Sequence, residues 1–168
     1  MLLASPPPRL TESNPKARRD PIIDAGVGYI EKHGLWVFLL AGKVPFAGSH
    51  AHLDAVSDID AFRRMRHEHP AGANLAISHG PSGTGALDYD SRNDDADRSG
   101  FQRLREFVAG HPTTVLRTGD GIQLFYCRPA DWQTGNWHNI APGLDFKGPG
   151  GYSLLPPSRH PTTGRHYE

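Results

Sequence analysis

The sequence Ala86-Leu87-Asp88-Tyr89-Asp90 places an acidic side chain at two positions that are two residues apart. In a β-strand, side chains two residues apart point to the same face of the sheet. A strand here would direct the carboxylates of Asp88 and Asp90 to one face and Tyr89 to the other. Two ionised carboxylates on one face repel each other, and a hard divalent cation relieves this repulsion by binding oxygens of both. The pattern is typical of phosphoryl or nucleotidyl transfer, in which metal ions stabilise the attacking and leaving oxygens.

A second interpretation of this acidic pair needs no metal. Acidic residues are common in turns, so Asp88 and Asp90 also fit a solvated edge of a loop. The pair alone does not separate the two interpretations, and the remaining motifs of the chain have to decide between them.

The composition limits the class of protein. The chain has 168 residues, enough for one domain or for two lobes that share a cleft. Its 18 basic residues equal its 18 acidic residues, which argues against a non-specific nucleic-acid coating protein but not against a local basic groove. The single cysteine, Cys127, excludes an internal disulfide and a multi-cysteine zinc site, and we expect it to be buried in a strand. This usage fits a reduced, cytoplasmic protein.

Neither a membrane span nor a signal peptide is predicted. No apolar run reaches the roughly 20 residues that a spanning helix requires. Residues 1–4 lack the basic start and the apolar length of a signal peptide. Residues 1–19 are rich in proline and basic side chains and are predicted to form a flexible leader, so residues 20–168 form the folded domain.

Capping and turn residues divide the domain into short elements. Helices are predicted at 21–33, after the cap Asp20 and before Gly34, at 59–69, and from a cap on Asp97 or Ser99 to about Gly110. Strands are predicted at 35–40, 74–78, 86–90, 113–117, 122–128, 144–147 and 152–155. Residues 129–142, with their two tryptophans, are predicted to form a loop.

The glycine-rich segment 80–85 predicts a tight hairpin between the strand 74–78 and the strand of Asp88. It is not a P-loop, because Ala86-Leu87 stands where that motif requires Lys-Ser/Thr. The segment from Asp95 to Glu106 has the ligand spacing of an EF-hand, but no helix is predicted to enter it, so a calcium site is rejected.

Histidines and arginines give two weaker signals. His50, His52, His67 and His69 raise the possibility of a zinc site, which lacks any supporting cysteine. The arginines of the helix 59–69 (Arg63, Arg64 and Arg66) are most simply explained as a solvated face.

Several separated motifs, taken in their order, resemble the bifunctional primase–polymerase domain of the archaeo-eukaryotic primase superfamily, which occurs in plasmid, phage and prophage replication proteins. The resemblance runs from about Tyr29 to Tyr167. It is carried by Gly42-Lys43-Val44-Pro45, Asn74-Leu75-Ala76-Ile77, Leu87-Asp88-Tyr89-Asp90, Thr118-Gly119-Asp120-Gly121-Ile122-Gln123, Gly143-Leu144-Asp145-Phe146-Lys147-Gly148, Gly151-Tyr152, Pro156-Pro157-Ser158, Gly164-Arg165 and Tyr167.

The resemblance implies an α+β fold of two lobes with an active-site cleft and an RNA-recognition-motif-like sheet, antiparallel or mixed. It implies that Asp88, Asp90 and Asp145 are the catalytic carboxylates and hold two Mg²⁺ or Mn²⁺ ions, a role that agrees with the chemistry of paired carboxylates. The implied partners are a single-stranded DNA template with primer, NTP or dNTP, and a helicase in the same chain or replisome. Candidate nucleotide-binding residues are Gln123, Lys147, Lys43, Thr118, Ser158, His160 and Arg165.

Two residues depart from the family pattern. Gln123 stands where the family usually has a histidine that contacts the phosphates of the incoming nucleotide, and glutamine cannot carry the imidazolium charge. Lys147 stands where the family often has arginine, so a two-pronged phosphate contact is replaced by a point charge. Both changes are compatible with metal binding and bear on the rate and on priming from two free nucleotides.

Three hypotheses follow for function. The favoured one is a template-directed nucleotidyltransferase, a DNA primase or polymerase. The second is a catalytically weakened module that holds a nucleotide or single-stranded DNA beside a helicase, with Gln123 as the mark of lost activity. The third is a metal-dependent phosphohydrolase that uses the same carboxylates. Two of the candidate nucleotide-binding residues also have a purely structural explanation: Ser158 fits a turn, and Lys147 fits an ion pair with Asp145.

Overall fold

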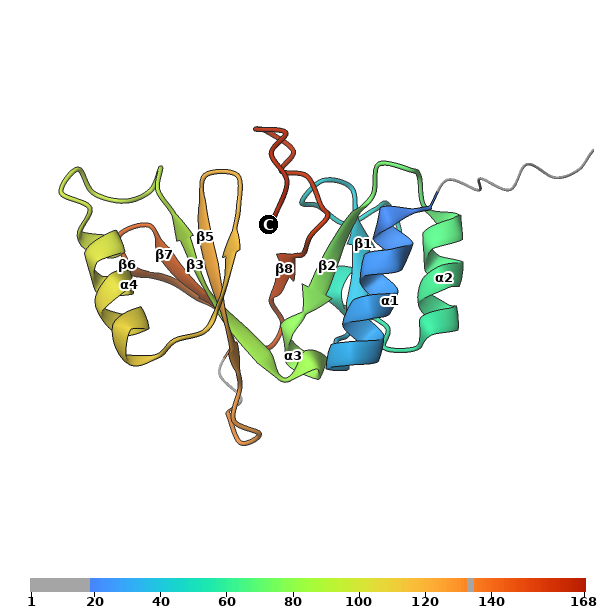
Figure 1. The fold of residues 1–168 in the computed structure, drawn as a ribbon, viewed down its shortest axis with the longest axis horizontal. Coiled ribbons are helices and arrows are strands. Elements are labelled where there is room, and N and C mark those ends of the chain that lie inside the picture. Colours follow the sequence, from blue (N-terminus) through green and yellow to red (C-terminus); the bar gives the residue numbers. More distant parts are fainter. Residues whose placement is uncertain (1–18, 133–134) are drawn as a thin grey trace, which may run out of the picture.

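Two separate antiparallel sheets divide the chain into two lobes (Figure 1). The computed structural model describes residues 19–132 and 135–168, so the predicted leader lies, apart from Arg19, outside the described residues. Within the described residues, the strands of both sheets pair antiparallel. The α+β architecture of two lobes that the resemblance implied is confirmed, with antiparallel sheets.

Lobe one is a three-stranded sheet covered on its outer face by helices. It comprises α1 (Pro21–His33), β1 (Val37–Leu40), the 3₁₀ helix η1 (Ala51–Asp54), α2 (Ile59–Glu68), β2 (Asn74–Ser78) and β8 (Tyr152–Leu154). The strand order is β1-β2-β8, and α1 and α2 cover the face that is turned away from lobe two (Figure 1). The sheet therefore takes its last strand from near the end of the chain.

The ends of α1 are set by its capping residues. The Asp20 carboxylate accepts hydrogen bonds from the backbone N–H groups of Ile22 and Ile23, at 2.9 and 3.4 Å. Gly34 ends the helix with φ +63°, a left-handed conformation that favours glycine. The predicted helix 21–33 is confirmed at both ends, because its signals are local to the sequence.

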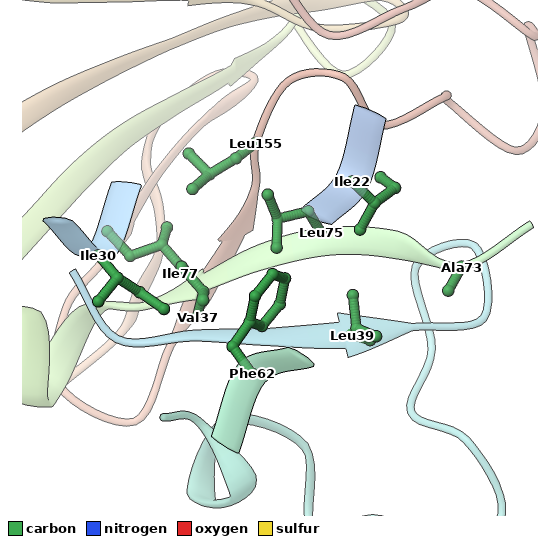
Figure 2. Packing of buried hydrophobic residues seen from close by; sticks show 9 residues of the cluster. All are labelled: Ile22, Ile30, Val37, Leu39, Phe62, Ala73, Leu75, Ile77 and Leu155. Carbon is green, nitrogen blue, oxygen red and sulfur yellow. The ribbon is translucent and has the colours of Figure 1, made fainter. Parts of the chain in front are cut away.

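The core of lobe one forms between the sheet and the two helices (Figure 2). Phe62 of α2 is fully buried and packs against the outer side chains of β1 and β2, which include Val37 and Leu75. A Cβ on Gly26 would lie 2.1 Å from the Phe62 ring, so glycine lets α1 approach α2 closely. The Arg66 guanidinium is buried too and contacts the Asp20 carboxylate at 2.9 Å. The prediction of a solvated Arg66 is therefore wrong.

Lobe two is a five-stranded sheet with one helix on its outer face. It comprises β3 (Thr84–Asp90), α4 (Ser99–Gly110), β4 (Thr114–Arg117), β5 (Gly121–Cys127), β6 (Trp137–Ala141) and β7 (Leu144–Lys147), in the strand order β4-β5-β3-β7-β6. On the outer face, Tyr89, Leu124 and Leu144 pack with Leu104 of α4. The opposite face of this sheet, which we call the cleft face, is turned toward lobe one (Figure 1).

The glycine-rich segment 80–85 joins the two lobes instead of forming a hairpin. The strand β2 pairs with β1 and β8, whereas β3 pairs with β5 and β7, so the predicted hairpin is wrong. The short helix α3 (His79–Ser82) lies between them and ends at Gly83 with φ +63°. Turn residues predict that the chain changes direction, but they carry no information about which strand becomes the partner.

Three other local predictions need correction. The segment predicted as the loop 129–142 contains the edge strand β6. Cys127 is the last residue of β5 and is exposed, not buried as predicted. The start of α4 is capped mainly by Asp94, whose carboxylate accepts from the N–H groups of Gly100 and Phe101, while Asp97 accepts from Ser99.

The C-terminal segment crosses between the lobes. The Tyr167 N–H donates to the carbonyl of Ser158 at 2.9 Å, and Arg117 of β4 exchanges two backbone hydrogen bonds with Glu168. The Tyr167 side chain is buried with Leu116 of lobe two and Leu154 of lobe one. This segment therefore ties β4 to lobe one and lies between the two lobes (Figure 1).

Candidate active site

A row of polar side chains crosses the cleft face of lobe two. In the strand register, Gln123 of β5 lies directly opposite Asp88 of β3, and Asp145 of β7 lies opposite Asp88 on the other side. Directly paired residues of neighbouring strands share a face. Asp90 lies two residues along β3 and shares that face as well. The predicted alternation of β3 is thus confirmed, and three strands bring the predicted residues together.

A cavity of about 330 Å³ opens where this row meets lobe one. Six side chains predicted from the sequence line it together with Asp88: Asp90, Gln123, Lys147, Thr118, Lys43 and His160. The other side chains that the argument below uses are Arg92, Asp120, His138 and Tyr167. The cavity takes its walls from both lobes, because Lys43 follows β1 while His160 and Tyr167 belong to the C-terminal segment.

The two carboxylates of β3 each contact a cation of the protein. The Lys147 ammonium lies 2.6 Å from a carboxylate oxygen of Asp88, so Lys147 pairs with Asp88 and not with Asp145. The Arg92 guanidinium binds both oxygens of Asp90, at 3.1 and 2.7 Å. These hydrogen bonds from Arg92 lower the pKa of the Asp90 carboxyl group below its ordinary value, so Asp90 is ionised at neutral pH.

Asp145 lies at the end of the row, outside the lining of the cavity. Its carboxylate accepts a hydrogen bond from the backbone N–H of Asn139 at 2.9 Å and contacts the His138 ring nitrogen at 3.2 Å. Asn139 has φ +53°, in an irregular stretch of the pairing between β6 and β7. The edge strand β6 therefore holds the Asp145 side chain in place.

Gln123 is the residue of the row whose amide oxygen has no hydrogen-bond partner among the described residues. Its side chain is only 4% exposed, and its amide oxygen is buried without a hydrogen bond. A buried polar group without a partner costs free energy, and such groups in native proteins are often satisfied by a ligand or an ordered water. Gln123 also lines the cavity, which makes its amide a candidate ligand contact.

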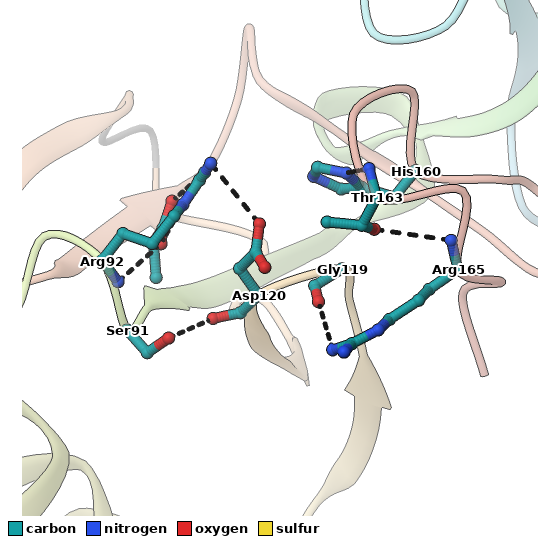
Figure 3. A network of polar contacts seen from close by, with 8 residues as sticks. Ser91, Arg92, Gly119, Asp120, His160, Thr163 and Arg165 are labelled. Atoms are coloured by element: carbon teal, nitrogen blue, oxygen red, sulfur yellow. Dashed lines mark hydrogen bonds and ion pairs between the residues drawn. The ribbon is translucent and has the colours of Figure 1, made fainter.

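The wall from lobe one carries a lysine and a histidine. Burial lowers the pKa of Lys43 and that of His160 from their ordinary values. The His160 ring accepts a hydrogen bond from the N–H of Thr163 at 3.3 Å (Figure 3), so it is neutral in this arrangement. A Cβ on Gly119 would lie 2.4 Å from the His160 ring, which explains why glycine is needed in this turn.

Two predicted nucleotide-binding residues are engaged elsewhere. The Ser158 hydroxyl is fully buried and bridges both backbone groups of Leu75, accepting at 2.8 Å and donating at 3.0 Å. The Arg165 side chain donates to the Gly119 carbonyl at 3.2 Å (Figure 3). Neither residue lines the cavity. In this arrangement Ser158 fixes the C-terminal segment to β2, and Arg165 fixes it to the turn between β4 and β5.

A family model for the N-terminal domain of bifunctional DNA primase/polymerases matches residues 27–168. The chain belongs to this family. Membership of the primase/polymerase family indicates nucleotidyl transfer as the class of activity, with DNA and nucleotides as the substrates. The comparison with curated proteins found no match.

Several polar residues that line this cavity were not predicted as site residues, among them Arg92, Asp120 and His138. Arg92 follows Asp90 at the spacing of two, a signal that was present but was not used. Asp120 stands within a motif that carried the resemblance, and only the fold brings it to Arg92, at 3.4 Å. His138 lies in the segment predicted as a loop.

The described residues hold no preformed metal cluster and no helix that could span a membrane. In residues 19–132 and 135–168, no three or more His, Cys, Asp or Glu side chains are grouped as they stand in a way that could hold a metal ion. Of the four histidines considered for zinc, His50 contacts Asp54 and His69 contacts the carbonyl of Met65. Among the described helices, none has the length and apolar character needed to cross a membrane.

Proposed function

We propose that the domain is a template-directed nucleotidyltransferase, a DNA primase or polymerase, whose reaction takes place in the cavity between the lobes. One observation carries this proposal: the strand register aligns Gln123, Asp88 and Asp145 in one row on the cleft face, with Asp90 beside them. The 330 Å³ volume lies in the usual range of small-molecule sites. Family membership supplies the reaction class.

The carboxylates of this row have the chemistry that Mg²⁺ or Mn²⁺ requires. Hard divalent cations prefer carboxylate oxygens, and Asp88, Asp90 and Asp145 offer three carboxylates on two paired strands. Lys147 and Arg92 already bring positive charge against Asp88 and Asp90, so this part of the cleft accommodates cations. We infer that Asp88, Asp90 and Asp145 hold the metal ions once these two side chains give way.

Bound metal ions would lower the charge on the attacking 3′-hydroxyl and on the leaving pyrophosphate. The protein groups around them supply binding and orientation. Lys43 and Lys147 line the cavity and offer ammonium groups to a triphosphate, and Thr118 offers a hydroxyl. Gln123 offers an uncharged amide, so it orients a phosphate or sugar oxygen without adding charge.

The remaining elements of the proposal follow from the resemblance. A single-stranded DNA template with primer would enter along the cleft, and the setting would be replication of the plasmid or phage type, with a helicase as partner. Ser158 and Arg165 would act on the nucleotide only through the C-terminal segment, which they hold against both lobes. His160, neutral and in the cavity wall, would contact the nucleotide as a hydrogen-bonding group.

One observation favours a second candidate, a weakened nucleotide- or DNA-binding module. Gln123 cannot supply the positive charge of an imidazolium, and the two carboxylates of β3 are already paired with protein cations. Such a module would bind nucleotide in the same cavity without transferring it.

The deciding experiment is extension of a labelled primer on a single-stranded template with dNTPs, in Mg²⁺ and in Mn²⁺. We expect the wild-type domain to extend the primer and both Asp88→Asn and Asp145→Asn to lose this activity. Asp60→Asn, on the exposed side of α2, is the matched control and should extend normally. Nucleotide binding without extension under any condition would favour the binding module, and nucleotide hydrolysis without template would point to a phosphohydrolase.

A further inference from the structure

Arg92 lies at the edge of the cavity, and the function proposed above gives it no role of its own. Its side chain is 54% exposed and makes two separate sets of contacts. The Nε and Nη2 atoms bind the two oxygens of Asp90, and the Nη1 atom lies 3.4 Å from an Asp120 oxygen (Figure 3). The backbone N–H of Arg92 also donates to Asp90, at 3.0 Å.

The contacts to Asp90 use the same oxygens that a metal ion would need. A guanidinium that binds both oxygens of a carboxylate forms a strong, directional pair. A divalent cation takes lone pairs of these oxygens at about 2.0–2.6 Å, which leaves no room for the guanidinium in its present position. Metal ion and Arg92 therefore compete for Asp90, and the loss of one contact should favour the other.

Asp120 provides a second place for the displaced guanidinium. The Ser91 hydroxyl donates to the Asp120 carbonyl at 2.6 Å, and the Ser91 N–H donates to the same oxygen at 3.1 Å. These bonds hold the turn of Asp120 next to Arg92 (Figure 3). Because half of the Arg92 side chain is exposed, a rotation toward Asp120 disturbs little packing. A guanidinium has five N–H donors, so Asp120 leaves several of them free for an anion.

We propose that a divalent cation displaces Arg92 from Asp90, and that Arg92 then turns to Asp120 and binds a phosphate group of the nucleotide. This inference rests on the proposed function, since it requires a cation at Asp90. In this proposal Arg92 is a nucleotide-binding residue, and its side chain stays paired with Asp90 as long as no metal is bound. It also gives Asp120 a positioning role.

The first test measures Mn²⁺ binding to the whole chain without nucleotide, by electron paramagnetic resonance of free Mn²⁺. We expect Arg92→Ala to bind Mn²⁺ about fivefold more tightly than the wild type, because a competing ion pair is gone. Arg92→Lys keeps the charge without the fork and should fall between the two. Arg63→Ala removes an arginine from an exposed pair with Asp60, far along the chain, and should leave the affinity unchanged.

The second test measures the affinity of a dNTP in saturating Mn²⁺ with the same variants. We expect Arg92→Ala to bind it about tenfold more weakly, since a charge-assisted hydrogen bond to phosphate is lost. Opposite changes in the two affinities are the mark of the exchange, which a purely structural role of Arg92 would not produce. An unchanged or weaker Mn²⁺ affinity, or a dNTP affinity that does not fall, overturns the proposal.

Asp90→Asn separates this inference from the proposed function. Loss of Mn²⁺ binding in Asp90→Asn together with no gain in Arg92→Ala would refute the exchange and leave the metal site standing. Mn²⁺ binding of Asp90→Asn at wild-type strength would refute the metal role of Asp90 itself. Thermal melts of each variant check that the fold is retained, as expected because the Arg92 side chain is exposed and that of Asp90 is partly exposed.

Discussion

The two faces of β3 differ in polarity and in contacts, although their residues alternate along one strand. On the outer face, Leu87 and Tyr89 pack against other apolar side chains, and the Tyr89 hydroxyl donates at 2.8 Å to Asp94, which caps α4. On the cleft face, Asp88 and Asp90 carry charge into a cavity and contact Lys147 and Arg92. A shift of one residue along the strand exchanges the two environments.

This difference shows how one strand can separate stability from chemistry. Apolar burial on the outer face stabilises lobe two, so the cleft face is free to keep side chains that contribute little to stability. The like charges of Asp88 and Asp90 and the unpartnered amide oxygen of Gln123 are unfavourable for folding alone. Such exceptions to good packing concentrate where a ligand is expected to bind. Variants on the two faces should therefore give opposite effects on stability and on activity.

The largest expected effect comes from Asp88→Asn on the cleft face. We expect primer extension to fall by a factor of about 10³ or more, roughly 4 kcal/mol of transition-state stabilisation, because a carboxylate that we propose as a metal ligand is lost. The free energy of unfolding should change by less than about 1 kcal/mol, since the pair with Lys147 is partly exposed. Chemical denaturation and a single-turnover extension assay measure the two quantities. A large loss of stability would contradict the separation of the faces.

The next effect is the reverse, from Leu124→Ala on the outer face of β5. Leu124 is 1% exposed and neighbours Gln123, which points to the cleft. Its truncation should lower the free energy of unfolding by about 3 kcal/mol, through lost burial and the cavity that remains. At a temperature at which the variant is folded, the dNTP affinity should be that of the wild type. A changed affinity would show that the two faces are coupled.

A third effect concerns a buried polar residue of α3, the helix that joins the two lobes, and tests whether this residue serves stability instead of catalysis. His79 of α3 is fully buried and hydrogen-bonded to Thr84 and Ser153, and burial lowers the pKa of His79 to about 3. Between this value and the ordinary pKa of about 6.5, the unfolded chain binds a proton that the folded chain does not. Stability should therefore fall as the pH falls from 6.5, by about 2 kcal/mol at pH 5.

The matched variant for this effect is His79→Gln, which keeps hydrogen-bonding groups but does not titrate. Its free energy of unfolding should depend less on pH than that of the wild type between pH 6.5 and 5, measured by denaturant titration at each pH. Equal slopes for the two proteins would mean that His79 takes up its proton in the folded state. In that case water would reach His79 more easily than its burial indicates.

The smallest expected effect concerns Gln123→His, which introduces the histidine that the resemblance described above leads us to expect at this position. We expect at most about a tenfold gain in primer extension, about 1.4 kcal/mol, because an imidazole can add charge at the phosphates. Gln123→Leu is the matched control: it removes the unpartnered amide, should increase stability and should weaken dNTP binding. A stable Gln123→Leu variant with unchanged dNTP binding would show that the amide faces no ligand.

Local signals in the sequence were sufficient for much of this picture. The capping residues Asp20 and Gly34 predicted both ends of α1 correctly, because a cap acts within one turn of the helix. The alternation at 86–90 identified the acidic face of β3 because the period of two is a property of any strand. What the sequence could not supply was the partner of each element. The segment 80–85 predicted a turn, but whether β3 would pair with β2 depends on the whole of lobe two.

The same limit applied to the site. Asp88 and Asp90 were found from their spacing, and Asp145 only through the resemblance. The contact between Arg92 and Asp120 depends on how two turns meet in space. The pairing of Lys147 with Asp88 depends on the register between β7 and β3, which places Lys147 opposite Ala86. Buried Arg66 was mistaken for a surface residue because its partner, Asp20, lies in another helix cap.

The order of strands also determines how this protein can fold. Lobe two lies between β2 and β8 in the chain, so the sheet of lobe one is completed only after all of lobe two has been made. Pairing of β2 with β8 has a large sequence separation and is therefore slow, whereas the hairpin of β4 and β5 forms from neighbouring residues. During synthesis, the side chains of Phe38 and Leu40 stay exposed until Leu154 and Tyr167, which cover them in the folded domain, have been made. We therefore expect this cluster to close late in folding, and until then its apolar side chains are exposed to aggregation or to a chaperone.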